Sequence, residues 1–280
     1  MKIIKNIKVQ GIHSKPIITD VFYKENHQLK KVVVFCHGYK VFKDWGAWNL
    51  MAEAFANSGL FFIKFNFSHN GGTFEQPVDF PDLEAFGNNN YSKELDDLGS
   101  IIDWVSENPI FMNEIDSKDI SLIGHSRGGG VVLLKSNEDP RINKVITLAG
   151  VSDFKSRFPK DQQFQKWREK QVYFVKNGRT QQKMPHFFQF FEDFEKNASR
   201  LNIQNATQNL TIPQLIIHGN NDFSVLIEEA ENLHKWSSCS ELKIIKNADH
   251  VFNVFHPWER KIISKELGEV ISSCISFLNK

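Results

Sequence analysis

Cysteine is scarce in this chain of 280 residues, which contains only Cys36, Cys239 and Cys274. Neither a C-x-x-C pair nor a Cys/His cluster is present, so no metal site is indicated, and we expect three free thiols. The sequence also lacks a phosphate-binding G-x-x-x-x-G-K-S/T loop and an H-E-x-x-H zinc motif. We therefore predict that the protein uses neither a metal nor a cofactor.

Runs of one charge sign and long apolar runs are missing as well. The chain has 34 basic and 33 acidic residues and a formal net charge of +1, which gives no indication of nucleic acid or an anionic membrane as a partner. No apolar run approaches the length of a membrane span, and residues 1–8 lack the apolar core of a signal peptide. We expect no membrane association and a cytoplasmic location.

The composition that remains is ordinary for a globular protein, with 41% hydrophobic and 24% charged residues. Short apolar runs alternate with segments of helical periodicity. The expected strands are 3–9, 17–23, 32–35, 61–67, 121–123, 145–148, 215–219 and 242–245, and the expected helices include 45–57 and 93–107. The alternation predicts a single α/β domain over residues 1–280, with a mostly parallel sheet covered by helices on both faces.

The pentapeptide G-H-S-R-G at residues 124–128 carries the strongest chemical signal. An expected strand precedes it and the apolar segment 129–134, read as a buried helix, follows it. A G-x-S-x-G sequence in this setting is typical of a nucleophile elbow, which would expose Ser126 on a tight, strained turn. A side chain two residues before or after the serine would collide with neighbouring backbone, which explains the two glycines.

An activated serine needs a general base and an acid that orients the base. Asp222 follows the expected strand 215–219, and His250 follows the expected strand 242–245. All three polar residues therefore come just after a strand, where open α/β sheets place their chemistry. The sequence predicts a catalytic triad of Ser126, Asp222 and His250.

With these motifs the chain resembles the α/β-hydrolase-fold serine hydrolases of the esterase and prolyl-oligopeptidase-like branch. Four local signatures carry the resemblance, at residues 37–39, 124–129, 218–222 and 248–250. The resemblance implies an α/β-hydrolase fold with a central sheet of about eight strands. Two departures are that Asn247 stands where the family often has glycine, and that the loop 66–72 lacks the aspartate and arginine of many relatives.

The resemblance also assigns roles to individual residues. His250 would take the proton of Ser126 and return it to the leaving group, while Asp222 would hold the imidazole in the required tautomer. The backbone N–H groups of Tyr39 and Arg127 would form the oxyanion hole.

Other residues compete for these roles. His256 is the alternative base, whereas Asp153 and Asp249 are the alternative acids. His250 and Asp222 are favoured because each matches a family signature and directly follows its strand. The remaining histidines near the motifs, at positions 37, 125 and 218, are expected to support the local structure.

Residues 152–208 interrupt the alternation and are rich in phenylalanine and tryptophan. We predict that they form a helical cap inserted between the sixth and seventh strands, including a helix over 186–196. Most of the rings are expected to attach the cap to the main domain. His69, Phe187 and Phe191 are the candidate substrate contacts. The polar segment 68–92 is expected to be a loop without a core element. Its acidic residues at 79, 82 and 84 are expected to be solvated, and the alternative is that they bind a cationic group of the substrate, as in an aminopeptidase.

The sequence favours a serine esterase that cleaves carboxylic esters of small or medium-sized substrates through an acyl-enzyme. A short-peptide peptidase, a thioesterase or an acyltransferase would use the same triad and differ in pocket and acceptor. A binding module that keeps the fold without catalysis is the alternative from another class. The expected partner is a small-molecule ester or acyl substrate.

Overall fold

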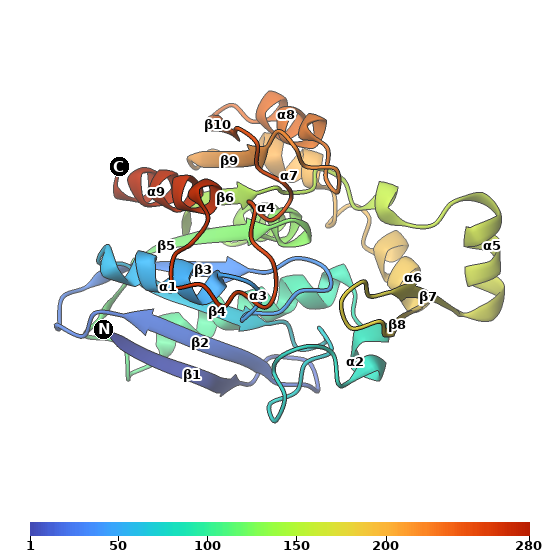
Figure 1. The fold of residues 1–280 in the computed structure, drawn as a ribbon, viewed down its shortest axis with the longest axis horizontal. Helices are drawn as coiled ribbons and strands as arrows, with labels where there is room; N and C mark the ends of the chain where they lie inside the picture. The colour runs from blue at the N-terminus through green and yellow to red at the C-terminus, as the bar shows by residue number, and fades with distance from the viewer.

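The central sheet has eight strands in the order β1-β2-β4-β3-β5-β6-β9-β10. The computed structural model, which describes residues 1–280, gives their bounds. They are β1 (Lys2–Val9), β2 (Ile17–Tyr23), β3 (Lys30–Cys36), β4 (Phe61–Asn66), β5 (Ile115–His125), β6 (Ile142–Leu148), β9 (Gln214–Gly219) and β10 (Ser240–Ile245). The strand β2 pairs antiparallel with β1 and β4, and every other pair is parallel. The predicted α/β-hydrolase fold with its mostly parallel sheet is thereby confirmed (Figure 1).

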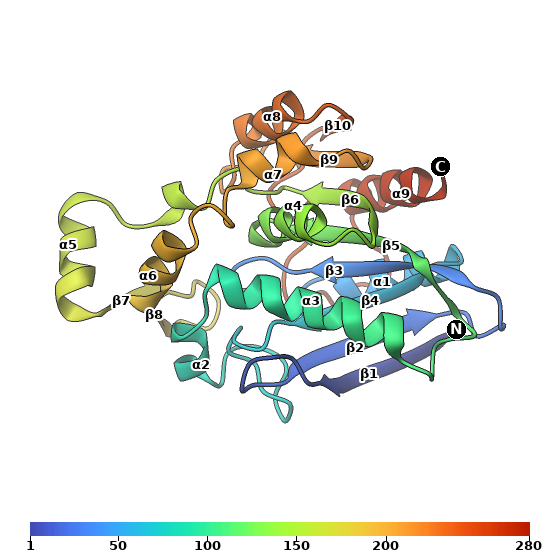
Figure 2. The ribbon, with the colours of Figure 1, turned by 180° about the vertical axis from the view of Figure 1, so that it is seen from behind.

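Helices cover both faces of this sheet. One face carries α1 (Trp48–Asn57) and α9 (Lys265–Asn279), and the other carries α3 (Tyr91–Glu107), α4 (Arg127–Glu138) and α8 (Ile227–Trp236) (Figures 1 and 2). Side chains along β3 alternate between the two resulting cores, with Val32 and Val34 in one and Val33 and Phe35 in the other. This division explains why the central strands read as continuous apolar runs. None of the helices combines the length and the apolar character that a membrane span requires.

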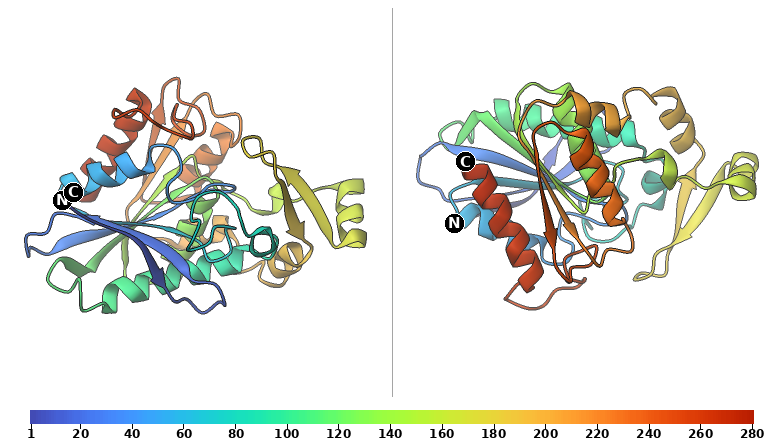
Figure 3. Two further views of the ribbon diagram at one scale, coloured as in Figure 1. Left: turned by 60° about the horizontal axis from the view of Figure 1, so that its bottom comes forward. Right: turned by 90° about the horizontal axis from the view of Figure 1, so that it is seen from above.

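The segment between β6 and β9 differs from the helical cap that the sequence predicts. It contains η1 (Lys155–Arg157), α5 (Asp161–Lys170), β7 (Val172–Lys176), β8 (Lys183–Phe187), α6 (Gln189–Lys196) and α7 (Ile203–Asn209). The strands β7 and β8 form an antiparallel hairpin that projects with α5 beyond the main sheet (Figure 3). The prediction of helices alone is wrong here because valine, tyrosine and phenylalanine, which make up most of β7, also favour strands. We call residues 152–208 the cap segment.

The segment 68–92 contains a core element, which its polar sequence did not predict. It contains α2 (Leu83–Gly87), and its Phe80 and Phe86 are buried with Phe42 and with Met184 of β8. Hydrogen bonds also join the two segments: the Gln182 side chain donates to the Phe80 carbonyl at 3.1 Å, and Ser92 Oγ donates to Asp193 at 2.8 Å. The segment 68–92 is therefore the platform on which the cap segment docks.

Asp97 on α3 is a buried carboxyl group whose protonation is expected to make stability depend on pH. One oxygen accepts a hydrogen bond from the Ser68 backbone N–H at 2.7 Å, and the other has no partner. Burial, only partly opposed by this hydrogen bond, raises the pKa of Asp97 to about 7. Since the unfolded chain ionises this group near pH 4, the folded state binds one more proton between about pH 4 and pH 7.

The wild-type protein should therefore lose stability relative to Asp97→Asn as the pH rises through this window. The difference in free energy of unfolding between the two proteins should grow by up to about 1.4 kcal/mol per pH unit and become constant above about pH 7. Urea unfolding at pH 5, 6, 7 and 8 measures it, with Glu107→Gln, an exposed position on the same helix, as the control. A difference that stays constant over this range would contradict a buried, protonated Asp97.

Candidate active site

Ser126 lies on a tight turn between β5 and α4. Its backbone has φ +56° and ψ −118°, which is a strained conformation for a residue with a side chain. A Cβ on Gly124 would lie 2.1 Å from the Gly128 carbonyl oxygen, and a Cβ on Gly128 would lie 2.5 Å from the Cys36 carbonyl oxygen. Both glycines are therefore required by the close approach of the turn to neighbouring backbone.

The His250 ring lies between Ser126 and Asp222. His250 Nε2 is 3.0 Å from Ser126 Oγ, and His250 Nδ1 is 2.7 Å from Asp222 Oδ2. The imidazole can accept the serine proton at Nε2 while Nδ1–H donates to the carboxylate. The three residues of the predicted triad thus lie next to one another, each within hydrogen-bonding distance of the next.

The environment of Asp222 keeps its carboxyl group ionised. Burial raises its pKa, but hydrogen bonds from His218, His250 and the Val225 backbone N–H outweigh this effect and hold the pKa well below its usual value. His218 is itself buried, with Nε2 2.8 Å from the Val225 carbonyl oxygen and 3.4 Å from Asp222. An ionised carboxylate in this position can stabilise a positive charge on the His250 ring.

The loops that carry Asp222 and His250 are joined to each other. Backbone N–H of Asn221 donates to the Ala248 carbonyl at 3.0 Å, and backbone N–H of Asn247 donates to the Asn220 side chain at 2.7 Å. A Cβ on Gly219 would lie 2.2 Å from the Ala248 carbonyl oxygen, so the approach depends on glycine. Asn247 has φ +61°, a conformation that asparagine tolerates and that explains the family's frequent glycine there.

His125, next to Ser126 in the chain, forms a hydrogen bond with the backbone of His250. Its Nε2 is 2.8 Å from the His250 carbonyl oxygen, and its Nδ1 is buried without a partner. Burial lowers the pKa of His125 to about 3, so the ring is neutral and donates through Nε2–H. His125 therefore holds the backbone of His250 in place through a neutral ring.

The rivals for base and acid lie away from Ser126 Oγ. Nδ1 of His256 accepts a hydrogen bond from the Gly46 backbone N–H, and its ring packs between Phe42 and Trp45. The Asp153 carboxylate accepts from backbone N–H groups at the start of η1, and Asp249 accepts from the backbone of its own loop. Neither aspartate is paired with His250.

Two backbone N–H groups beside Ser126 are free to bind an oxyanion. The N–H groups of Tyr39 and Arg127 donate to no acceptor in the protein. The loop after β3 lies directly against the nucleophile, since a Cβ on Gly38 would lie 2.9 Å from Ser126 Cβ. His37 is buried behind this loop, with Nδ1 2.9 Å from the Gly38 carbonyl oxygen, and burial lowers its pKa to about 4.

A pocket of about 440 Å³ opens over Ser126 and His250. The cap segment contributes Tyr173, Val175, His186 and Phe190 to its wall, together with Phe154 and Arg157. The Tyr39 hydroxyl and His186 Nε2 are 2.6 Å apart, and burial lowers the pKa of His186 to about 3, so this hydrogen bond involves a neutral ring. The cap segment thus both encloses the pocket and contacts Tyr39 in the loop that lies against Ser126.

The three candidate substrate contacts lie outside this pocket. His69 follows β4, which is separated from β5 by β3, and its ring lies against Ser68 Oγ and the ring of His13. Phe187 packs against Gly87 of α2, and Phe191 packs against rings inside the cap segment. On α6 the helix period instead turns Phe190, one residue before Phe191, toward the pocket.

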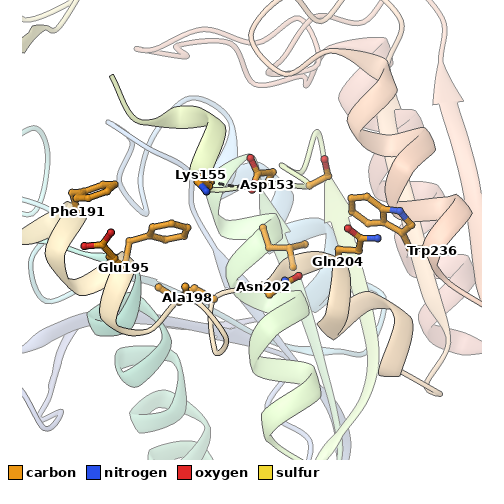
Figure 4. A pocket seen from close by; sticks show the side chains of 12 residues that line it. Asp153, Lys155, Phe191, Glu195, Ala198, Asn202, Gln204 and Trp236 are labelled. Carbon is orange, nitrogen blue, oxygen red and sulfur yellow. Dashed lines mark hydrogen bonds between the residues drawn. The ribbon is translucent and has the colours of Figure 1, made fainter. Parts of the chain in front are cut away.

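A second pocket of about 350 Å³ lies between η1, α6, α7 and α8 and contains none of the triad (Figure 4). Figure 4 shows Phe191 and Glu195 on one side and Trp236 on the opposite side, with Asp153 and Lys155 above. The rival acid Asp153 therefore borders this pocket and not the one over Ser126. No group of three or more His, Cys, Asp or Glu side chains is arranged to hold a metal ion.

Several pocket residues carried no recognisable signal in the sequence. His186 follows Met184-Pro185 without a motif, and Tyr91 lies at the start of a helix whose periodicity indicated only packing. Both reach the pocket through tertiary contacts, because Tyr91 stacks on Phe154 at 3.7 Å and His186 on Tyr173 at 4.7 Å between ring centroids.

Comparisons with known proteins agree with this architecture. The Prolyl oligopeptidase family matches residues 68–254. Among solved structures, Est1E from Butyrivibrio proteoclasticus superposes with a TM-score of 0.70 at 14% sequence identity and covers 98% of both chains. The structure of Est1E with bound ferulic acid superposes with a TM-score of 0.75 at 15% identity and also covers 98% of both chains. A dienelactone hydrolase from Anabaena variabilis gives 0.64 at 17%, covering 99% of this chain and 97% of that one. No curated protein matches the sequence.

Proposed function

Because the chain belongs to the prolyl oligopeptidase family of α/β-hydrolases, we propose that it is a serine esterase that cleaves carboxylic esters through an acyl-enzyme on Ser126. The single observation that carries this proposal is the continuous hydrogen-bonded series from Ser126 Oγ through His250 to the ionised Asp222. An inert binding module has no chemical need for this arrangement.

The reaction follows from the positions of these groups. As Ser126 Oγ bonds to the ester carbonyl carbon, its proton moves to His250 Nε2, and the carbonyl oxygen becomes an oxyanion. The free N–H groups of Tyr39 and Arg127 stabilise that oxygen, each by about 3 kcal/mol of barrier. His250 then protonates the departing alcohol oxygen, and the carbon–oxygen bond to the alcohol breaks.

The acyl-enzyme is hydrolysed by the same groups in reverse. His250 takes a proton from water, the resulting hydroxide adds to the acyl carbon, and the proton passes to Ser126 Oγ as the carboxylic acid leaves. A carboxylic acid is the product class of any such reaction. The ferulic acid bound to Est1E, a structural neighbour, is a molecule of this class and supports an ester as the substrate.

A short-peptide peptidase is the second candidate, because the matching family is one of oligopeptidases. The acidic residues that would suit a peptide amino group do not reach the pocket over Ser126. Asp79 pairs with Arg179 and Asp82 with Lys15. The absence of an acidic group from the pocket favours the ester over a peptide with a free amino terminus.

The proposal is tested by measuring kcat/KM for 4-nitrophenyl esters and for aminoacyl 4-nitroanilides of matched acyl groups. We expect turnover of the esters, preference for them over the anilides, and loss of both activities in His250→Ala. Preference for the anilides would establish the peptidase instead, and folded protein without turnover of either would overturn both.

A further inference from the structure

The wall of the pocket over Ser126 contains three lysine and arginine side chains and no aspartate or glutamate. The three basic residues are Lys40, Arg127 and Arg157. The chain as a whole, in contrast, has nearly equal numbers of acidic and basic residues. A binding pocket with charge of one sign selects ligands of the opposite sign.

The Arg127 guanidinium is largely buried beside Ser126, where it forms an ion pair with Glu94 but leaves most of its N–H donors unused. Its side chain is 15% exposed, and its only hydrogen bond within the protein is from Nη1 to Glu94 at 3.2 Å. Aromatic rings surround it, with its Cζ atom 4.5 Å from the ring centroid of Tyr39 and 5.4 Å from that of Phe190. A guanidinium has five N–H donors, and the nitrogens without a protein partner are not sealed from solvent, so they remain available to an occupant of the pocket.

Lys40 adds a positive charge that no carboxylate neutralises. Its ammonium group lies 5.1 Å from the ring centroid of Tyr39, and its nearest hydrogen-bond acceptor is the Lys176 carbonyl oxygen at 3.5 Å. Burial lowers the pKa of Lys40, as expected for an ammonium group that lacks an acidic neighbour. Arg157 and Arg127, in contrast, each have a carboxylate partner, Glu229 and Glu94 respectively. The unpaired charge therefore lies between Tyr39 and β7, where the cap segment meets the pocket.

The cap segment adds a long-range field of the same sign. Residues 152–208 contain 11 lysines and arginines and 6 aspartates and glutamates, a net charge of +5 in a chain whose total is +1. Such an excess on the segment that borders the pocket attracts anions and raises their rate of association.

We propose that the substrates of Ser126 are esters that carry a carboxylate group, which Arg127 and Lys40 bind while Ser126 attacks the ester carbonyl. This inference rests on the proposed esterase function and specifies its substrate class. Hydrogen bonds from cations to a carboxylate are stronger than those between neutral groups. The expected gain in kcat/KM over a neutral substrate of the same shape is about tenfold or more.

Two pairs of substrates test this on the intact protein, because the carboxylate can belong to either side of the ester. Mono-4-nitrophenyl adipate is compared with 4-nitrophenyl hexanoate for the acyl side, and 4-acetoxybenzoate with 4-acetoxybenzamide for the alcohol side, after subtraction of uncatalysed hydrolysis. We expect the anionic member to have the higher kcat/KM in one pair, and this preference to decline as the salt concentration is raised.

Substitution of Lys40 gives the second measurement. Lys40→Met should lower the anionic-to-neutral ratio of kcat/KM by about tenfold, mainly through KM, and Lys40→Glu should reverse the preference. Lys155→Met is the matched control and should leave the ratio unchanged. This exposed lysine belongs to the cap segment but borders the second pocket.

Failure of this inference is distinguishable from failure of the esterase proposal. Hydrolysis of the neutral esters without a preference in either pair, or a preference that Lys40→Met and Lys155→Met affect equally, would overturn the carboxylate assignment alone. Lack of turnover of all four esters by folded protein would overturn the esterase proposal as well.

Discussion

Replacement of Ser126 by alanine is expected to lower kcat for ester hydrolysis by at least about 10⁴-fold. The alanine keeps the backbone of the elbow and the position of His250, but no oxygen remains within 3.0 Å of Nε2 to attack the substrate. Residual hydrolysis would come only from binding and from the N–H groups of Tyr39 and Arg127. The measurement is steady-state hydrolysis of a 4-nitrophenyl ester at a protein concentration high enough to detect the residual rate.

Ser106→Ala serves as the control for this prediction. Ser106 lies on α3 and donates only to the Ile102 carbonyl oxygen within its own helix, so its loss should leave the rate unchanged. The far-ultraviolet circular dichroism of Ser126→Ala should match that of the wild type. A folded Ser126→Ala that keeps the wild-type rate would mean that another group performs the chemistry.

Replacement of Lys64 by methionine is expected to lower the free energy of unfolding by about 3–5 kcal/mol. The Lys64 ammonium is fully buried and lies 2.7 Å from Asp20 and 2.6 Å from Asp44. Lys43 contacts the same two carboxylates at 2.8 and 2.5 Å, which completes a buried network of two cations and two anions. Methionine fills a similar volume but leaves both carboxylates with only one cation, and the uncompensated buried charge is the cause of the loss.

Chemical denaturation of Lys64→Met measures this effect. Lys5→Met, at an exposed position on β1, should change the free energy of unfolding by less than about 0.5 kcal/mol. The double variant Lys64→Met/Asp44→Asn removes one charge of each sign and should recover part of the loss, because the network is then neutral again. Equal stability of Lys64→Met and wild type would show that the network contributes little.

The residues of the proposed triad could be found from the sequence because each lies in a short motif directly after a strand. Ser126, Asp222 and His250 are separated by long stretches of chain, yet parallel strands bring their carboxyl ends to one edge of the sheet. The glycines at 124, 128 and 219 left a local signal for the same reason, since each is needed where backbone approaches backbone.

The pocket wall could not be found in this way. His186 and Arg157 come from the cap segment, whose position over Ser126 depends on docking against α2 and α3 and not on any local pattern. On α6, a difference of one residue decides whether a ring lines the pocket over Ser126, as Phe190 does, or packs on Phe164 and borders the second pocket, as Phe191 does. Because phenylalanines occur on several faces of α6, the sequence does not show which of them faces the pocket.

The buried network around Lys64 was also hidden from sequence analysis. The run Phe61–Asn66 reads as an apolar strand with one lysine, which a solvent-facing position would explain equally well. Only the pairing of β2 with β4, which places Asp20 directly opposite Lys64, shows why the lysine is buried. Tertiary pairing of charges determined this position, and strand periodicity did not.

The central claim is that Ser126 is an activated nucleophile, and labelling by a fluorophosphonate tests it most directly. Wild-type protein, Ser126→Ala and Asp222→Asn are incubated with the probe and their intact masses are measured. We expect a single added phosphonyl group on the wild type, none on Ser126→Ala and much slower labelling of Asp222→Asn, in which the imidazole loses its ionised partner. A folded wild type that remains unlabelled, or equal labelling of Ser126→Ala, would contradict the claim.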